Sequence, residues 1–488
     1  MNRMVIDCDR SPFRVGRHLY GHFAEHLGRC VYDGLWVGEG SEIPNVAGHR
    51  RDVLEALRAL RMPNLRWPGG CFADTYHWRD GVGPRESRPR MVNVHWGGTT
   101  EDNSFGTHEF LDLCERLNCE PYIVGNLGSG TVREMAEWLE YLTHPGPGPM
   151  ADLRKSNGRE QPWNVLYWGV GNENWGCGGG MTAEHYANEF RRYATYCRHF
   201  GGGRLYKIAC GFTDDWNETL LRLAARQMDG LSVHYYAFAE SWDLKGSATG
   251  FSEQEWYGLL KNGLGVERFL RSTRTRLDRY DPEGRIGIVL DEWGAWYDAE
   301  PGTNPAFLYQ QNTIRDAVLA AASLHVFHRH ADRLHMANIA QTVNVLQAMV
   351  LTDGPKSVLT PTYHAFEMLK EHQDGEFLPV HAAELGHPAG AETLPQVSVS
   401  ATRSADGSIH LSATNLDASE GTEVEVEFRG GAPKTCSARL LHGRRLDAHN
   451  DFDRPDEVRP QAWDEPELRD GLLRMKLPAR SVAALRLA

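Results

Sequence analysis

Residues 167–175 read Tyr-Trp-Gly-Val-Gly-Asn-Glu-Asn-Trp, and this stretch predicts the fold. An apolar run ends abruptly at glycine and is followed by Asn172 and Glu173. Buried parallel strands deliver polar groups in this way to the mouth of a barrel, where the catalytic groups of such barrels lie. A second run, residues 286–293, ends the same way at Asp291 and Glu292. One such acid is most simply a helix cap, but two, each beside Trp and Gly, indicate a catalytic pair.

Strand-like and helix-like segments alternate from residue 19 onward, and this alternation predicts an α/β fold, a (β/α)8 or TIM barrel. We expect the eight strands at residues 19–25, 64–67, 121–126, 165–173, 205–211, 231–235, 286–292 and 337–341. Apolar residues recur at helical spacing over 53–60, 184–200, 266–280 and 307–330. The interval between Glu173 and Glu292 has room for three βα repeats of about 40 residues each, which places the two glutamates on strands 4 and 7.

The pattern changes after about residue 366, where apolar and polar residues alternate between short turns, as in antiparallel strands. These runs cover residues 397–402, 409–414, 422–428 and 472–487, and we expect Met4-Val5-Ile6 to pair with the last of them. The sequence therefore predicts two domains. Residues 18–365 form the catalytic barrel, and residues 1–17 and 366–488 form a jelly-roll-like antiparallel β-sandwich.

The overall composition narrows the class of partner. The chain has 488 residues and a formal net charge of -13, whereas a nucleic-acid-binding protein needs clustered Lys and Arg, so we predict no nucleic-acid partner. No apolar stretch approaches the roughly 20 residues that span a bilayer, and the first residues lack the apolar core of a secretion signal. We therefore expect a cytoplasmic protein without a membrane partner.

Cysteine and histidine give little sign of a metal. The nine cysteines are scattered singly without a CxxC pair, so buried, reduced thiols are the default expectation. Cys71 and Cys177 stand apart because both lie in glycine-rich segments. The histidines at 22 and 26, and those at 325, 328 and 330, fit packing or solvated positions better than a metal site. The glycine-rich residues 176–180 lack the Lys-Ser or Lys-Thr of a phosphate loop. We predict no metal and no other cofactor.

A barrel mouth with two carboxylates, aromatic rings, amides and histidines, but without clustered lysines, suits cleavage of a glycosidic bond. One acid protonates the departing oxygen, and the other attacks the anomeric carbon or activates water. Trp175, Trp293 and Trp296 offer flat faces for sugar C–H groups, or else they are plain packing. The loops over residues 83–106 and 236–257 are long and aromatic, as in a substrate cleft, although a packed loop is the competing interpretation.

Several motifs, in order along the chain, carry a family resemblance. They are Gly21-His22-Phe23-Ala24-Glu25-His26, Leu65-Arg66-Trp67-Pro68-Gly69-Gly70, Trp78-Arg79-Asp80-Gly81-Val82-Gly83-Pro84, Gly171-Asn172-Glu173, Ser232-Val233-His234-Tyr235-Tyr236, Asp291-Glu292-Trp293 and Asn338-Ile339-Ala340-Gln341. The chain resembles glycoside hydrolase family 51, the α-L-arabinofuranosidases, nearly from end to end.

The resemblance implies a retaining, exo-acting hydrolase that releases terminal α-L-arabinofuranosyl residues from arabino-oligosaccharides or arabinoxylan fragments. Glu173 would be the acid/base and Glu292 the nucleophile, with carboxyl groups about 5 to 5.5 Å apart. It also implies homo-oligomers, specifically hexamers. The remaining site residues implied are Glu25, Asn172 and Gln341 at the furanose hydroxyls, Tyr236 on the nucleophile, His234 in support, and Trp96 closing the pocket.

One position departs from the family pattern. Cys71 stands where asparagine is expected after Pro-Gly-Gly, and a thiol is a weaker donor and acceptor than an amide. A substrate contact at Cys71 would therefore be altered, which leaves the exact sugar open. The alternatives are a galactofuranosidase, an endo-hydrolase of β-glucan or xylan, and a non-catalytic sugar-binding protein.

Overall fold

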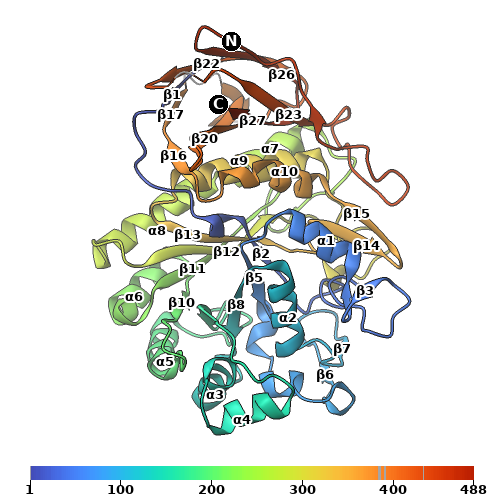
Figure 1. The fold of residues 1–488 in the computed structure, drawn as a ribbon, viewed down its shortest axis with the longest axis vertical. Coiled ribbons are helices and arrows are strands. Elements are labelled where there is room, and N and C mark those ends of the chain that lie inside the picture. Colours follow the sequence, from blue (N-terminus) through green and yellow to red (C-terminus); the bar gives the residue numbers. More distant parts are fainter. Residues whose placement is uncertain (1, 383–385, 390–391, 432) are drawn as a thin grey trace.

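The computed structural model describes residues 2–382, 386–389, 392–431 and 433–488. Figure 1 shows a barrel surrounded by helices and, above it in the view, a set of sheets that contains both chain ends. Helices α9 and α10 lie between the barrel strands and these sheets. No helix in the described ranges has both the length and the apolar character needed to cross a membrane.

The barrel is closed by eight strands in the order β10-β11-β12-β13-β2-β5-β8-β9, each parallel to its neighbours. Their bounds are β2 Gly21–Phe23, β5 Asn64–Trp67, β8 Glu120–Gly125, β9 Tyr167–Val170, β10 Tyr206–Cys210, β11 Gly230–Ala237, β12 Gly287–Ala295 and β13 Leu334–Ala340. Every predicted strand is present, so the predicted barrel is confirmed. Glu173 follows the fourth strand, β9, and Glu292 lies in the seventh, β12.

Helices follow the strands around the outside of the barrel. They are α1 Arg51–Ala59, α2 Thr107–Leu117, α3 Val132–Thr143, α4 Pro149–Ser156, α5 Ala183–Tyr196, α6 Asp214–Ala224, α7 Glu253–Leu264, α8 Val266–Tyr280, α9 Ile314–Arg329 and α10 Pro361–Leu369. Helix α8 has the predicted bounds. Helix α9 begins seven residues later than predicted, because Thr313 and Asp316 form a capping box that starts the helix at Ile314.

The remaining long strands form two sheets, which confirms a β-sandwich. One sheet has the order β17-β1-β22-β26-β25 and the other β16-β20-β21-β27-β23-β24. Their bounds are β1 Asn2–Asp7, β16 Glu376–Leu378, β17 Val380–Ala382, β20 Val397–Arg403, β21 Ile409–Asn415, β22 Thr422–Arg429, β23 Cys436–His442, β24 Gln461–Ala462, β25 Glu467–Arg469, β26 Leu472–Leu477 and β27 Ser481–Leu487. Side chains from both sheets, including Ile6, Val426, Leu411 and Leu485, share one buried core.

The expected pairing of the first strand was wrong. Strand β1 lies parallel to β22 and antiparallel to β17, and β22 separates it from β26. In β22 every second side chain is buried, so this strand offers an apolar face that continues the one presented by Met4 and Ile6. The division into domains at residues 17/18 and 365/366 stays a prediction, and the second of these positions lies within helix α10.

Short two-stranded elements complete the list. They are β3 Asn45–Val46, β4 His49–Arg50, β6 Met91–Val92, β7 Thr100–Glu101, β14 Val350–Asp353, β15 Lys356–Leu359, β18 Gly386–Ala389 and β19 Glu392–Pro395. The β6–β7 hairpin belongs to the long loop that was predicted to border the cleft.

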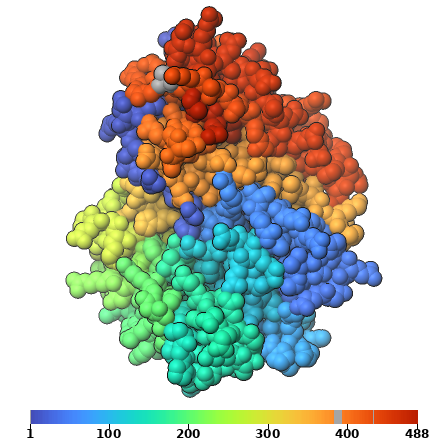
Figure 2. All heavy atoms as spheres, in the orientation of Figure 1, coloured from blue at the N-terminus to red at the C-terminus, as the bar shows by residue number. Residues whose placement is uncertain are grey.

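Two buried histidines of α9 join the barrel to the sandwich. His325 contacts Ser398 Oγ at 2.9 Å and Ser412 Oγ at 2.8 Å, and His328 contacts Ser400 Oγ at 2.8 Å. Both histidines therefore have packing roles, as the sequence favoured over a metal site. The space-filling view shows the orange and red atoms of the sandwich packed against the barrel at this level (Figure 2).

Replacing His325 with alanine should lower the free energy of unfolding by about 3 kcal/mol at pH 7.5, because it leaves a cavity and two buried hydroxyls without a partner. Burial also lowers the pKa of His325 well below its usual range. Below pH 6.5 the unfolded wild-type chain therefore gains a proton that the native chain does not bind, which weakens the wild type. The difference between the two proteins should shrink by about 1.4 kcal/mol per pH unit there.

Urea titrations at pH 7.5 and 5.5 measure both effects. The matched control is His185→Ala, because His185 is exposed on helix α5 and should change stability by less than about 0.5 kcal/mol. Equal losses for the two variants would contradict the packing role of His325.

Candidate active site

A tight turn after β9 presents Glu173 to the barrel mouth. Gly171 has a φ of 81° and Glu173 a φ of 42°, both in the left-handed region that non-glycine residues rarely adopt. The buried carboxylate of Asp74 holds the turn by accepting hydrogen bonds from the Asn172 backbone N–H at 2.8 Å and the Asn174 side-chain amide at 3.1 Å. A strained non-glycine residue that is fixed by its neighbours is typical of a functional position.

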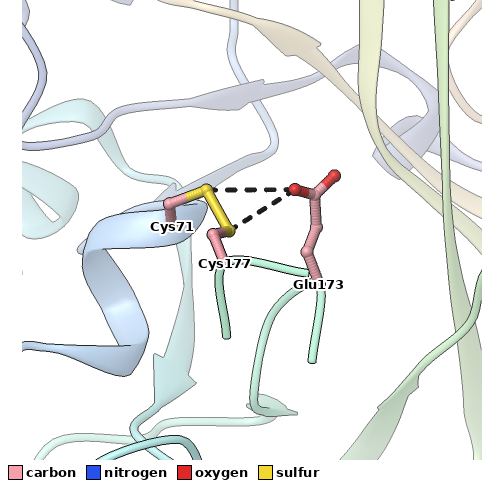
Figure 3. A group of neighbouring side chains, drawn as sticks. All are labelled: Cys71, Glu173 and Cys177. Atoms are coloured by element: carbon pink, nitrogen blue, oxygen red, sulfur yellow. Dashed lines mark hydrogen bonds between the residues drawn. A yellow bond between two sulfur atoms is a disulfide. The ribbon is translucent and has the colours of Figure 1, made fainter. Parts of the chain in front are cut away.

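The Glu173 carboxyl group is 21% exposed and lies between an imidazole and two sulfur atoms. Its Oε1 is 2.9 Å from Nδ1 of His234. Its Oε2 is 3.5 Å from Sγ of Cys177 and 3.9 Å from Sγ of Cys71, as Figure 3 shows. Glu173 is thus partly exposed to solvent, and each of its two carboxyl oxygens contacts a neighbouring side chain.

The Glu292 carboxylate is more enclosed, with a side chain 8% exposed. Nη1 of Arg66 donates to its Oε1 at 2.8 Å, and the Tyr236 hydroxyl donates to its Oε2 at 2.8 Å. Burial and the Glu292 charge raise the pKa of Tyr236 well above its usual value, so Tyr236 remains a phenol that donates its proton. Arg66 and Tyr236 thus hold both oxygens of Glu292 in place.

His234 connects the two glutamates. It is paired with Glu292 in the β11–β12 register, and its Nδ1 lies 3.5 Å from Glu292 Oε2 as well as 2.9 Å from Glu173 Oε1. One oxygen of each glutamate and this nitrogen lie within 4.8 Å of one another. Burial alone would lower the pKa of His234, but the charges of Glu292 and Asp291 and the bond to Glu173 outweigh it and raise the pKa to about 10. His234 is therefore a cation at neutral pH.

Behind this pair, Arg66 and Asp291 form a buried ionic network. Arg66 Nε lies 3.3 Å from Asp291 Oδ2, and Nη2 of Arg66 donates to Oδ1 of Asn172 at 2.6 Å. Asp291 also accepts hydrogen bonds from the hydroxyls of Tyr122 at 2.7 Å and Ser232 at 2.6 Å. Burial would raise the pKa of Asp291, yet Arg66 and the other partners lower it to about 2. The network thus keeps the Asp291 carboxylate ionised beneath Glu292.

A third acid, Glu25, follows β2. It accepts hydrogen bonds from the Phe72 backbone N–H at 3.1 Å, Trp96 Nε1 at 2.9 Å and Gln341 Nε2 at 2.9 Å. Burial raises the pKa of Glu25, the nearby Glu292 charge adds to the rise, and the three donors only partly offset it, so that the pKa is about 7. The bond from Trp96 brings its loop into contact with Glu25, and the role of Trp96 in closing a pocket stays a prediction.

Among the predicted site residues, two buried amide atoms have no hydrogen-bond partner within the part of the protein that the structure describes. They are Nδ2 of Asn172 and Oε1 of Gln341. Each residue uses its other amide atom on a protein partner, Asn172 on Arg66 and Gln341 on Glu25. A buried donor and a buried acceptor that remain free are suited to ligand hydroxyl groups.

The three candidate tryptophans have different roles. Trp293 is buried and packs on Phe327 and Phe366, so the suggestion that it faces sugar was wrong; its neighbour Glu292 takes the inward side of β12. Trp175 stacks on Phe212 with ring centroids 3.7 Å apart. Trp296 packs edge-on against Tyr236 at 5.0 Å. Trp175 and Trp296 are both half-buried.

The second long loop, residues 236–257, combines both proposed interpretations. Phe251 and Trp256 are buried in the main hydrophobic core, whereas Trp242 is 57% exposed. Trp242 lies 5.2 Å from Trp296, ring to ring, and so extends the aromatic surface next to Tyr236. Only the part of the loop near Trp242 can border a cleft.

Cys71 and Cys177 form a disulfide with a Cα–Cα distance of 5.5 Å, so the default expectation of reduced thiols was wrong for these two residues. Cys71 begins a short 3-10 helix, η2 Cys71–Asp74, after β5, and Cys177 lies in the turn after β9. The other seven cysteines are free, and among them only Cys436 is not buried. Position 71 therefore presents a disulfide sulfur, with no proton to donate, where an amide or a thiol was considered.

Two sets of side chains bring metal-binding atom types within 4.8 Å of one another: Cys71, Glu173 and Cys177, and Glu173, His234 and Glu292. The first set contains both sulfurs of the disulfide, which are not thiolates and do not act as metal ligands. The second set depends on His234. Its raised pKa keeps both ring nitrogens protonated at neutral pH, whereas a metal ligand must offer an unprotonated nitrogen. Neither set is suited to a metal in this state of the protein.

Two family models and a relative of known name match this chain. A family model for an α-L-arabinofuranosidase 1 domain matches residues 56–199, and a model for an α-L-arabinofuranosidase C-terminal domain matches residues 291–481. A relative from Bacteroides ovatus, named an intracellular exo-α-L-arabinofuranosidase, is 50% identical over 99% of this chain and 95% of its own. The chain belongs to the α-L-arabinofuranosidase family.

Solved structures of the family agree over the whole chain. A GH51 arabinofuranosidase from Xanthomonas axonopodis pv. citri superimposes with a TM-score of 0.98 at 44% identity, covering 100% of this chain and 99% of that one. A thermostable GH51 α-L-arabinofuranosidase from Thermotoga petrophila gives a TM-score of 0.90 at 30% identity with full coverage of both chains. The resemblance to glycoside hydrolase family 51 is thereby confirmed.

The structure of this arabinofuranosidase brings together all nine residues that the sequence singled out, but the role of each stays a prediction. They are Glu25, Cys71, Trp96, Asn172, Glu173, His234, Tyr236, Glu292 and Gln341. Sequence reasoning missed Arg66, Asp291 and Asp74 as members of the site. Arg66 carried a usable signal, because a charged residue within an apolar strand needs a buried partner. No sequence signal indicated that Asp74 would bond to the turn after β9.

Gly70 is the position where a small change should reach the Glu292 carboxylate. A Cβ at residue 70 would lie 2.8 Å from Glu292 Oε1, closer than such contacts occur. Gly70→Ala should displace the carboxylate and lower kcat/KM about 100-fold while the fold is retained, because catalysis is sensitive to shifts of about 1 Å. Steady-state kinetics and circular dichroism measure the two quantities.

The matched control is Gly16→Ala, because Gly16 has a φ of -59° and no atom within 4 Å of an added Cβ. This variant should keep wild-type kinetics. Full activity of Gly70→Ala would contradict the placement of Glu292 against the Gly69-Gly70 backbone.

Proposed function

We propose that this protein is a retaining, exo-acting α-L-arabinofuranosidase in which Glu173 is the acid/base and Glu292 the nucleophile. The observation that carries the proposal is the placement of one oxygen of each glutamate within 4.8 Å of the other, with His234 between them. Retaining glycosidases have carboxyl groups about 5 to 5.5 Å apart, whereas inverting enzymes need about 6.5 to 9.5 Å to admit a water molecule. The spacing therefore favours direct attack by a carboxylate.

In the first step, an oxygen of Glu292 attacks the anomeric carbon of the arabinofuranosyl residue. The bond from that carbon to the glycosidic oxygen breaks, and Glu173 delivers a proton to the departing oxygen. Arg66 and Tyr236 donate to the two carboxylate oxygens of Glu292 and hold it oriented before the attack. The His234 cation, 2.9 Å from Glu173, stabilises the carboxylate that Glu173 becomes when its proton leaves.

In the second step, Glu173 accepts a proton from water, and the resulting hydroxide oxygen bonds to the anomeric carbon. The ester bond to Glu292 breaks, and Glu292 regains its charge beside Arg66. Two inversions at the same carbon give net retention of configuration. The 21% exposure of Glu173 against 8% for Glu292 suits this division, because only the acid/base must meet water and a leaving group.

The proposed sugar contacts come from the free polar atoms around the pocket. Asn172 Nδ2 and Gln341 Oε1 have no hydrogen-bond partner among the residues that the structure describes, and Glu25 lies beside Gln341 and Trp96. These three groups are placed to bind furanose hydroxyls. The disulfide sulfur of Cys71 would contact the sugar where an amide was expected, with dispersion and without a strong hydrogen bond.

We also propose that the enzyme acts on short arabino-oligosaccharides or arabinoxylan fragments inside the cell. The Bacteroides ovatus relative is named an intracellular exo-acting enzyme, and free cysteines are typical of intracellular proteins. We further propose that the enzyme assembles as a hexamer, as the family resemblance implies.

Azide rescue should separate the two glutamates by product stereochemistry. With Glu292→Ala and an aryl α-L-arabinofuranoside, azide should attack the sugar directly and give the β-azide, of inverted configuration. With Glu173→Ala, azide should attack the Glu292 ester and give the α-azide, of retained configuration. Without azide, both variants should lose at least about 1,000-fold in kcat.

Proton NMR of the isolated azides distinguishes the two configurations. The β-azide from Glu173→Ala together with the α-azide from Glu292→Ala would mean that the roles are reversed.

A substrate panel should separate the remaining alternatives. We expect hydrolysis of the aryl α-L-arabinofuranoside to exceed that of the aryl β-D-galactofuranoside and of cello- or xylo-oligosaccharides by at least about 100-fold in kcat/KM. A chelator should leave the rate unchanged, because the proposed steps use only side chains. Preference for galactofuranoside or oligoglucan would overturn the assigned sugar, loss of activity with chelator would reinstate a metal, and no hydrolysis at all would favour a sugar-binding protein.

A further inference from the structure

The Cys71–Cys177 disulfide touches the acid/base directly. Both sulfurs lie within 4.0 Å of Oε2 of Glu173, as Figure 3 shows, whereas His234 contacts the other oxygen, Oε1. Both cysteines are half-buried, whereas the free cysteines of the described chain are buried except Cys436. Cys71 and Cys177 thus place two half-buried sulfur atoms in direct contact with the group that transfers protons in the proposed mechanism.

The oxidation state of this pair decides what Oε2 can bond to. A disulfide sulfur has no proton, so neither contact can stabilise a carboxylate by donation. Reduction separates the two sulfurs, which now lie 3.5 and 3.9 Å from Oε2, and each resulting thiol would carry an S–H that can point at Oε2. Donors to the charged form favour ionisation of a carboxyl group. Reduction should therefore favour the carboxylate of Glu173 over its protonated, proton-donating form.

The disulfide also fixes the turn that carries Glu173. The backbone oxygen of Glu173 accepts from the N–H of Gly176 at 2.7 Å and of Gly178 at 3.1 Å, on either side of Cys177. The bond to Cys71 ties this turn to η2 on the neighbouring side of the barrel mouth. Reduction breaks the covalent link between the turn and η2. Because Gly176 and Gly178 flank Cys177 and donate to the Glu173 backbone oxygen, a movement of Cys177 would also move Glu173.

We propose that Cys71 and Cys177 form a reversible redox-modification site that controls Glu173, an inference that rests on the function proposed above. The reductant is a dithiol. One of its thiolates attacks a sulfur of the pair and breaks the S–S bond to give a mixed disulfide, and its second thiolate then displaces the protein thiolate. Two electrons and two protons pass to Cys71 and Cys177, and the dithiol leaves as a disulfide. A small-molecule disulfide reverses both exchanges.

The other groups that face Glu173 keep their chemistry in both states. They are the His234 cation on β11, the Glu292 carboxylate on β12, the Tyr236 phenol on β11 and the buried thiol of Cys210 on β10. None of these is a partner in the exchange. A change in pH dependence that follows reduction can therefore be assigned to the sulfur pair.

The experiment compares oxidised and reduced wild-type enzyme. Differential alkylation followed by peptide mass spectrometry reports the state of Cys71 and Cys177 independently of activity. The pH profile of kcat/KM for an aryl α-L-arabinofuranoside is then recorded for each state. Reduction should move the alkaline limb to lower pH by about half to one unit and lower kcat several-fold, and reoxidation with glutathione disulfide should restore both.

Variants assign the effect to the pair. Cys71→Ala and Cys177→Ala cannot form the disulfide and should give one profile that is insensitive to dithiol. Cys177→Ser places a hydroxyl donor near Oε2 and should show the lower alkaline limb under all conditions. The matched control is Cys436→Ser, which removes the half-exposed cysteine of β23 and should keep the full wild-type response.

Identical pH profiles of kcat/KM for the oxidised and the reduced wild-type enzyme, with both states verified by alkylation, would overturn the proposal. This comparison does not depend on whether the variants fold. A response that persists in Cys71→Ala, or a pair that stays oxidised in excess dithiol, would also overturn it. Absence of hydrolysis in both states would instead overturn the proposed function on which it rests.

Discussion

The buried guanidinium of Arg66 is the interaction on which the site depends. It lies between Glu292, Asp291 and Asn172, and its charge is the nearest compensation for two carboxylates that are almost fully removed from water. Burial would lower the pKa of Arg66, but the carboxylates of Asp291 and Glu292 raise it well above its usual value. Breaking such a group by removing one partner typically costs about 3 to 5 kcal/mol, because the remaining charges are left unpaired. The same cation orients Glu292, the proposed nucleophile, and supports the fold around it.

The barrel makes this arrangement possible because its strands end at one mouth. Arg66 lies on β5, across the barrel from β12, and His234 is in register with Glu292 on the neighbouring β11. The mouth therefore contains three acids within reach of two cations, and each acid has a different environment. Glu292 has two donors, Glu25 has three donors but lies beside a negative charge, and Glu173 has one cation and two sulfur atoms. These differences separate the proposed nucleophile, sugar ligand and acid/base.

Much of this could be predicted from the sequence, because the signals were local. Apolar runs that end in Asn172-Glu173 and Asp291-Glu292 define both the strands and the acids, and all eight predicted strands are present. Contacts between distant segments could not be predicted in the same way. The disulfide joins residues 106 apart on turns that follow different strands, and single cysteines carry no pairing information in their spacing. The sequence left sugar contact and packing open for Trp293, because adjacent strand residues face opposite sides and only the register shows which side is the core.

The central claim is that Glu173 and Glu292 act as a retaining pair, and methanolysis tests it most directly. In dilute methanol the enzyme transfers the sugar to methanol, and the methyl arabinofuranoside formed does not change its anomeric configuration afterwards. Proton NMR of the product from an aryl α-L-arabinofuranoside should show the methyl α-L-arabinofuranoside, as two displacements at one carbon require. The methyl β-L-arabinofuranoside as first product would show a single displacement and contradict the assignment of Glu292 as nucleophile.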